Sequence, residues 1–146
     1  MTRTIAIALL LAISALAADP TLEAANAEPN LEKRSEKALL AAQQFLDKLR
    51  KSGNLQDRAV VETALSNIRA GVELCVDSLE ASGKEARRSP KYFKKAEIGL
   101  RKLNRQLDDV RVALSADDRP PVAALLVYTR QVQEDLLLGI FTKKKK

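Results

Sequence analysis

The sequence predicts an all-α protein, and two observations carry that prediction. Apolar residues recur at alternating steps of four and three along four segments, which is the spacing of one buried face on an α-helix. Glycine, proline and capping residues separate these segments, and no segment alternates as a half-buried strand does. With 146 residues, the chain has the size of one domain.

The amino-terminal segment has the layout of a secretory signal peptide. Arg3 precedes an apolar run over residues 5–18, which is shorter than the roughly 20 residues that a membrane-spanning helix needs. Cleavage is expected after Ala17, with a second small-x-small site ending at Ala27 as the alternative. The mature chain is then periplasmic or secreted, has no transmembrane segment, and begins with a disordered tether over residues 18–29.

The first helix is expected to begin after the capping residue Asn30 and to end near Ser52, before Gly53. Asn54 is the expected cap of a second helix from about residue 55 to residue 82, where Gly83 stops it. The apolar stripes of these two helices are Leu39, Ala42, Leu46 and Leu49 in the first, and Val61, Leu65, Ile68, Val72, Cys75 and Leu79 in the second.

Ser89 followed by Pro90 predicts the start of a third helix, which reaches about Leu114. The run of residues 117–121, Asp-Asp-Arg-Pro-Pro, interrupts the chain before a fourth helix that ends near residue 141. Their stripes are Phe93, Ala96, Leu100, Leu103, Leu107, Val110 and Leu114, and then Val122, Leu125, Val132 and Leu136 with Thr129 as a polar interruption.

Short connections between long helices favour antiparallel neighbours. The sequence therefore predicts an up-down-up-down four-helix bundle over residues 30–142, followed by a lysine tail over residues 143–146. Two alternatives stay open: a three-helix bundle with a loosely packed first helix, and a helical homodimer that completes its core between two chains.

Basic residues are concentrated in one part of the chain. Residues 84–105 hold nine Lys and Arg against two Glu, and on the third helix these basic side chains fall opposite the apolar stripe. The candidate residues for binding an anionic partner are Arg87, Arg88, Lys91, Lys94, Lys95, Arg101, Lys102 and Arg105, together with Lys143, Lys144, Lys145 and Lys146 of the tail.

The alternative to an anion-binding surface is an ordinary solvated face with surface salt bridges. If the second and third helices pack as a hairpin, acidic residues of the second lie beside basic residues of the third. The expected pairs are Glu80 with Lys91, Asp77 with Lys94, and Glu73 with Arg101.

Enzymatic chemistry finds little support in the composition. The chain has no histidine, which removes the commonest general base and metal ligand, and its lone Cys75 falls on a core stripe. The glycines form no phosphate-binding pattern, and the acidic pairs 108–109 and 117–118 lack the spacing of a calcium loop. We therefore expect no catalytic residue, metal or cofactor. Export and an aromatic content of 3% also disfavour nucleic acid as a partner.

Three stretches carry a resemblance: residues 89–98 (SPKYFKKAEI), residues 117–120 (DDRP) and residues 133–140 (QEDLLLGI) with the lysine tail. Together they resemble a family of small exported bacterial helical proteins without an assigned function, which implies no catalytic residue. Size, export and the basic helical surface are also similar to periplasmic stress chaperones of the Spy and CpxP kind, which are cradle-shaped helical dimers. The Leu-Thr-x-x-Gln motif of those chaperones is absent here.

The function that the sequence predicts is that of an exported, non-catalytic interaction or structural protein of the bacterial envelope. The alternative is a binding module for an anionic partner, such as lipid head groups, an envelope polymer or an unfolded client. The basic helix face would carry that binding.

Overall fold

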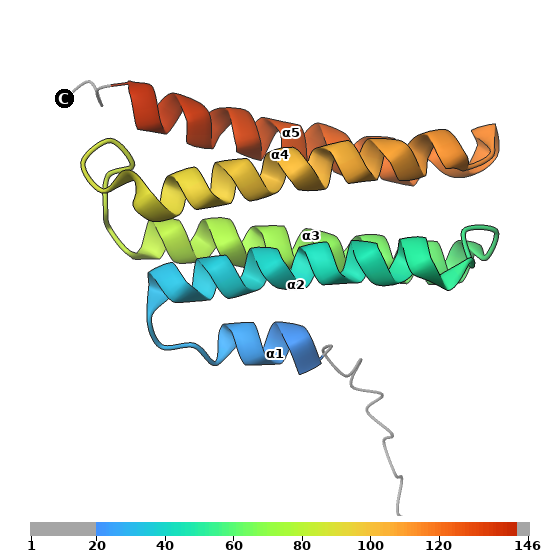
Figure 1. Cartoon of the computed structure of the whole chain (residues 1–146), viewed down its shortest axis with the longest axis horizontal. Coiled ribbons are helices and arrows are strands. Elements are labelled where there is room, and N and C mark those ends of the chain that lie inside the picture. The colour runs from blue at the N-terminus through green and yellow to red at the C-terminus, as the bar shows by residue number, and fades with distance from the viewer. Residues whose placement is uncertain (1–19, 143–146) are drawn as a thin grey trace, which may run out of the picture.

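The computed structural model describes residues 20–142, and all regular structure in this range is helical (Figure 1). This confirms the all-α prediction. The elements are α1 (Pro20–Asn26), α2 (Leu31–Ser52), α3 (Arg58–Ala81), α4 (Pro90–Ala113), the 3-10 turn η1 (Ala116–Asp118) and α5 (Arg119–Phe141). The predicted signal peptide and the lysine tail lie outside the described residues.

The helix boundaries follow local capping chemistry. The Asn30 side chain accepts a hydrogen bond from the Lys33 amide at 2.9 Å, and Gly53 ends α2 at a φ of 70°, in the left-handed region. The expected cap of α3 at Asn54 is wrong. Asp57 takes that place because its Oδ1 accepts hydrogen bonds from the amides of Ala59 and Val60, so α3 begins three residues later than predicted.

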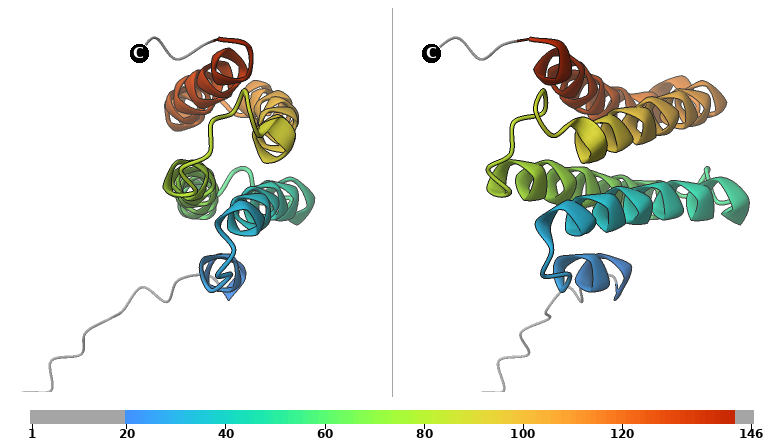
Figure 2. Two further views of the ribbon diagram at one scale, coloured as in Figure 1. Left: turned by 90° about the vertical axis from the view of Figure 1, so that its left-hand side faces the viewer. Right: turned by 60° about the vertical axis from the view of Figure 1, so that its left-hand side comes forward.

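The four long helices pack as two pairs. α2 lies against α3 and α4 lies against α5, and the second pair rests on the first with α4 beside α2 and α5 beside α3 (Figure 2, left). The consecutive helices α3 and α4 stand at diagonal positions and make few contacts. The side-by-side packing of these two helices, on which the expected ion pairs depended, is therefore absent from the described residues, because α4 packs on α5 and α2 instead.

The predicted stripes form the core of the bundle. Most of their residues are buried, and Ile68, Leu103 and Leu107 have no exposed surface, whereas Phe93 and Leu136 are only half-buried. Thr129, the polar interruption, is also completely buried. Its hydroxyl donates to the Leu125 carbonyl at 3.0 Å, so the polar group is satisfied inside its own helix.

The segment before α2 differs from the expected disordered tether. α1 packs against α2 and α3, with Ala25 only 1% exposed and Leu22 in contact with the core. These two apolar residues are three apart and therefore share one face of the short helix. The turn after α1 is fixed by Glu28, whose carboxylate forms an ion pair with Lys37 at 2.5 Å.

Candidate functional site

The outer side of α4 carries six of the twelve basic residues singled out in the sequence. Here we call the following six exposed side chains the basic face: Lys91, Lys94, Lys95, Arg101, Lys102 and Arg105. Arg87 and Arg88 are exposed in the connection just before α4. The structure brings the helical candidates together on one side of α4, and Lys143 to Lys146 lie outside the described residues.

The expected neutralisation of the basic face by α3 does not occur. Glu73 forms an ion pair with Arg69 of its own helix at 2.9 Å, and within residues 20–142 neither Asp77 nor Glu80 forms an ion pair with α4. The physical reason is the diagonal placement of α3 and α4, which keeps their outer faces apart. The acidic side chains are exposed on α3 and the basic ones on α4.

Three of the candidate basic residues form ion pairs with acidic partners, on α2, within α4, or in the connection before α4. Lys95 Nζ lies 3.0 Å from Glu36 Oε1 of α2, Arg101 Nη2 lies 2.8 Å from Glu97 Oε2, and Arg88 Nε lies 3.3 Å from Glu85 Oε2. Considering only residues 20–142, the candidates without an ion pair are Arg87, Lys91, Lys94, Lys102 and Arg105. Most of the positive charge on the outer side of α4 is therefore locally uncompensated.

One aromatic ring lies among these charges. The ammonium groups of Lys91 and Lys95 are 5.3 Å and 5.4 Å from the centre of the Tyr92 ring. Both distances fall within the roughly 6 Å range of a cation–π contact, which favours placement of the two amines near the ring. Tyr92 itself is half-buried against the core.

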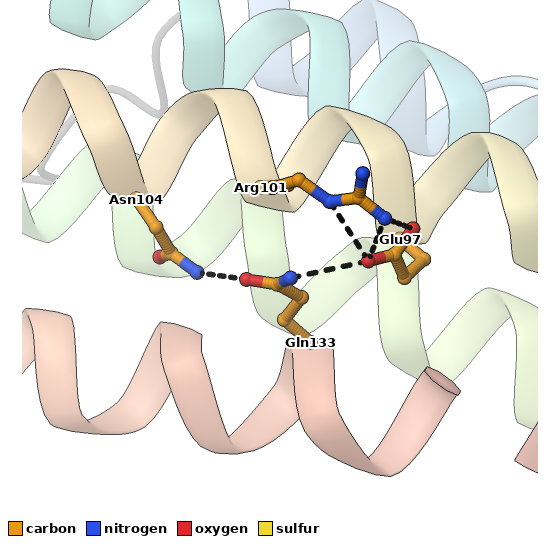
Figure 3. A network of polar contacts seen from close by, with 4 residues as sticks. All are labelled: Glu97, Arg101, Asn104 and Gln133. Carbon is orange, nitrogen blue, oxygen red and sulfur yellow. Dashed lines mark hydrogen bonds and ion pairs between the residues drawn. The ribbon is translucent and has the colours of Figure 1, made fainter. Parts of the chain in front are cut away.

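Arg101 belongs to a polar network that joins α4 to α5 (Figure 3). Glu97 is only 4% exposed, and its carboxylate accepts hydrogen bonds from Arg101 and, at 3.1 Å, from the Gln133 side-chain amide. The Gln133 carbonyl oxygen in turn accepts from Asn104 Nδ2 at 2.8 Å. Arg101 thus compensates a buried carboxylate, which distinguishes it from the free lysines of the basic face.

Sequence reasoning did not identify this network. Glu97 and Asn104 are seven residues apart on α4 and so lie on the same side of the helix, next to the apolar stripe. That spacing is the signal that could have identified them. Asn104 Oδ1 is buried and has no hydrogen-bond partner among the described residues.

A groove of about 430 Å³ runs between α2 and α4. Two exposed aliphatic side chains line it, Leu40 at 52% and Ile98 at 60% exposure. Gly99 lets the helices approach here, because a β-carbon at this position would stand 2.5 Å from Leu39 Cδ2. The lining residues are Ser35, Glu36, Leu39, Leu40, Gln43, Tyr92, Lys95, Ala96, Ile98, Gly99 and Lys102.

A smaller cavity of about 250 Å³ lies at the other end of the bundle, where Arg58 of α3 meets Asp118 of η1. Arg58 Nη2 donates to Asp118 Oδ1 at 2.8 Å, and Ser115 Oγ donates to Asp118 Oδ2 at 2.9 Å. These bonds, the one from Arg58 above all, lower the pKa of Asp118. The contact ties the turn before α5 to the start of α3.

The single thiol of the chain is enclosed in the core. Cys75 has no exposed surface, and burial raises the pKa of its thiol to about 12, which keeps it protonated and unreactive at neutral pH. Within the described range, no cluster of Cys, Asp and Glu is arranged to hold a metal ion. None of the helices over residues 20–142 is both long and apolar enough to span a membrane.

No family model, curated protein or solved structure matches this chain. Both resemblances drawn from the sequence therefore stay predictions, and the function has to be argued from the geometry of the site.

Proposed function

We propose that this protein is a non-catalytic helical interaction module of the bacterial envelope that binds an anionic partner through the basic face of α4. One observation carries the proposal: Lys91, Lys94, Lys102 and Arg105 are exposed and have no ion pair with any described residue. A cluster of uncompensated charge of one sign creates a positive potential that attracts anions. The attraction acts over a Debye length of about 10 Å at 0.1 M salt, so binding is expected to weaken as salt rises.

The placement of the acidic residues favours this function over a merely solvated face. A solvated face usually mixes both signs in weak surface pairs. Here, three acidic side chains that were expected to provide such pairs, Glu73, Asp77 and Glu80, are exposed on α3, diagonally across the bundle from α4. The acidic side chains of α3 and the basic side chains of α4 are therefore separated, and the acidic ones do not cancel the positive potential of the basic face.

We propose further that one chain supports this face as an up-down-up-down bundle. Leu46, Ile68 and Leu103 from three different helices are completely buried within a single chain. A core that is already closed needs no second chain to complete it. The bundle then acts as a rigid support that holds the basic side chains along one helix.

Export remains part of the proposal, and α1 supports cleavage after Ala17. Cutting after Ala27 would remove Leu22 and Ala25, both of which pack against the core. Cutting after Ala17 leaves α1 complete. Peptide mapping of periplasmic or secreted protein should therefore find Ala18 as the first residue, and an intact Met1 recovered from the cytoplasm would contradict export.

The basic face is tested by charge reversal on vesicles. The variant Lys91→Glu/Lys94→Glu should lose most of its co-sedimentation with phosphatidylglycerol vesicles at low salt, while the unchanged protein is retained. The matched control is Lys48→Glu/Lys51→Glu, which makes the same charge change at two exposed lysines of α2. Both variants should unfold at nearly the wild-type temperature, because exposed charges contribute little to folding.

Two results would contradict the proposal. Equal losses in both double variants would show that only net charge matters, and not the face. A loss of binding on deletion of Lys143 to Lys146 alone would assign the contact to the tail. Vesicles of phosphatidylcholine should retain none of these proteins.

A further inference from the structure

We infer that the groove between α2 and α4 binds the alkyl chain of a fatty carboxylate, whose head group lies at Lys102 and Arg105. The inference rests on the proposed anion-binding role of α4 and names the class of ligand: a single-chain anionic amphiphile. It joins two features that lie side by side on the described surface, an apolar groove and free positive charge at its edge.

The groove has the size and lining of a small-molecule site. Its volume of about 430 Å³ falls within the range of roughly 300 to 1,000 Å³ that such sites occupy. Leu39 and Ala96 are buried residues in its lining, and Leu40 and Ile98 remain largely exposed. An alkyl chain in the groove would remove the two exposed aliphatic side chains from water, which is the driving force for apolar binding.

Close contact between the helices fixes the groove. A β-carbon on Gly99 would collide with Leu39, and the Gln43 amide donates to the Gly99 carbonyl at 3.3 Å. The helices therefore meet at this glycine, and the larger side chains on either side of it form the walls. A groove held by the packing of the Leu39 and Gln43 side chains on Gly99 exists before the ligand arrives, which lowers the cost of binding.

The charges give the ligand a direction. Glu36 also lines the groove, but Lys95 neutralises it at 3.0 Å. Lys102 forms no ion pair with any described residue, and Arg105 follows three residues later on the same side of α4. The acidic residue Asp47 lies one turn after Gln43 on α2, but it forms no ion pair with Lys102. Lys91 is also unpaired, but its ammonium lies over the Tyr92 ring at 5.3 Å and does not line the groove, whereas Lys102 does. The carboxylate is therefore placed at Lys102, and the alkyl chain runs back past Ile98 toward Tyr92.

Charge and size favour this ligand over two other occupants. A second copy of the chain would bring an identical set of lysines against the first, and like charges across an interface are repulsive. An amphipathic helix docks through about four apolar anchors along its length. The groove offers only two exposed large aliphatic side chains, Leu40 and Ile98, which suits one alkyl chain.

Three probes distinguish the contribution of the carboxylate head group from that of the alkyl chain. Each is titrated into the mature chain by isothermal titration calorimetry, at concentrations below those at which it forms micelles. Sodium dodecanoate carries both parts, dodecyl maltoside has the same tail without charge, and acetate has the charge without the tail. We expect one dodecanoate to bind per chain, and the other two probes to bind at least tenfold more weakly.

Variants then locate the two parts. Ile98→Gln should weaken dodecanoate binding at least tenfold, whereas Val127→Gln should not, since Val127 is an equally aliphatic side chain, 73% exposed on α5 and outside the groove. Lys102→Gln should also weaken binding, whereas Lys48→Gln, at an exposed lysine that does not line the groove, should not. Leu40→Gln provides a second apolar test if Ile98→Gln unfolds.

The inference is overturned if dodecyl maltoside binds as tightly as dodecanoate, or if neither Ile98→Gln nor Leu40→Gln weakens dodecanoate binding. The same preparations are tested on phosphatidylglycerol vesicles, which separates the two proposals. Vesicle retention without dodecanoate binding refutes the groove and leaves the basic face standing. Absence of both refutes the proposed function as well.

Discussion

The Ala38 carbonyl oxygen lies 2.9 Å from the point where a β-carbon on Gly71 would stand. Ala42 lies equally close, with its own β-carbon 3.0 Å from the same point, so α2 and α3 meet through three small residues. Gly71→Ala should therefore force the helices apart. We expect a loss of about 1 to 3 kcal/mol in the free energy of unfolding, the usual cost of overpacking, measured by urea denaturation.

Gly139 provides the control for that substitution. A β-carbon there would meet only the Ala86 side chain, at the ordinary contact distance of 3.6 Å. Because alanine is favoured over glycine in a helix by about 1 kcal/mol, Gly139→Ala should be neutral or stabilising. If Gly71→Ala were also stabilising, the close contact between α2 and α3 would be refuted.

The network between α4 and α5 predicts a coupling between Asn104 and Gln133. Gln133→Leu removes the nearer acceptor of the Asn104 amide and leaves it only the Thr129 carbonyl at 3.5 Å, and weakening the pairing of a buried polar group costs about 1 to 3 kcal/mol. The double variant Asn104→Leu/Gln133→Leu should recover the part of that loss that comes from Asn104, whereas the buried Glu97 carboxylate still lacks the donor that Gln133 supplied. A double-mutant cycle by urea unfolding measures the coupling, and strictly additive losses would contradict it.

Cys75 should be inert in the folded protein. Its thiol is completely buried, with a pKa raised from 9.0 to about 12, so little thiolate exists at neutral pH and no reagent reaches it. A colorimetric disulfide reagent should label the thiol fully in denaturant and only slowly without it. Rapid stoichiometric labelling of the native protein would show that α3 does not bury this face.

The sequence predicted the long helices well because their apolar positions are periodic. Each apolar stripe has to face the core, whichever helix packs against it. It did not predict which helix lies beside which, since a stripe looks the same against any neighbour. That is why basic side chains of α4 were expected beside Glu73, Asp77 and Glu80 of α3. The start of α3 was missed for a similar reason: Asn54 and Asp57 are both good caps, and only the chain path selects one.

The candidate site was predicted in part. The basic residues of α4 could be named from their spacing, but whether each is free depends on its neighbours: Lys95 meets Glu36 across the groove, and Lys102 meets no acidic partner among residues 20–142. The groove depends on Leu40 and Ile98, two aliphatic residues that lie off the core stripes. Apolar residues off a stripe are a weak signal, because single exposed aliphatic side chains are common on protein surfaces.

The Arg58–Asp118 contact predicts a specific dependence of stability on pH. Arg58 donates to Asp118 Oδ1 through both Nε and Nη2, at 3.1 Å and 2.8 Å, and holds the pKa of Asp118 below its ordinary value of 3.8. A carboxyl whose pKa is lower in the folded state than in the unfolded state stabilises the protein above the unfolded pKa. That stabilisation is lost as the pH falls through the folded pKa.

Comparison with Arg58→Gln separates the contribution of Asp118 to the pH dependence of stability from the contributions of other carboxyl groups. Glu28, whose pKa is also lowered, by Lys37, titrates in the same acidic range but is unaffected by the substitution. Urea unfolding midpoints measured from about pH 5 downward should therefore fall less steeply in Arg58→Gln than in the unchanged protein, so that the two curves converge at low pH. Parallel curves over that range would mean that Asp118 gains nothing from Arg58 in solution, and that the turn before α5 is held by its other contacts, such as the hydrogen bond from Ser115 to Asp118.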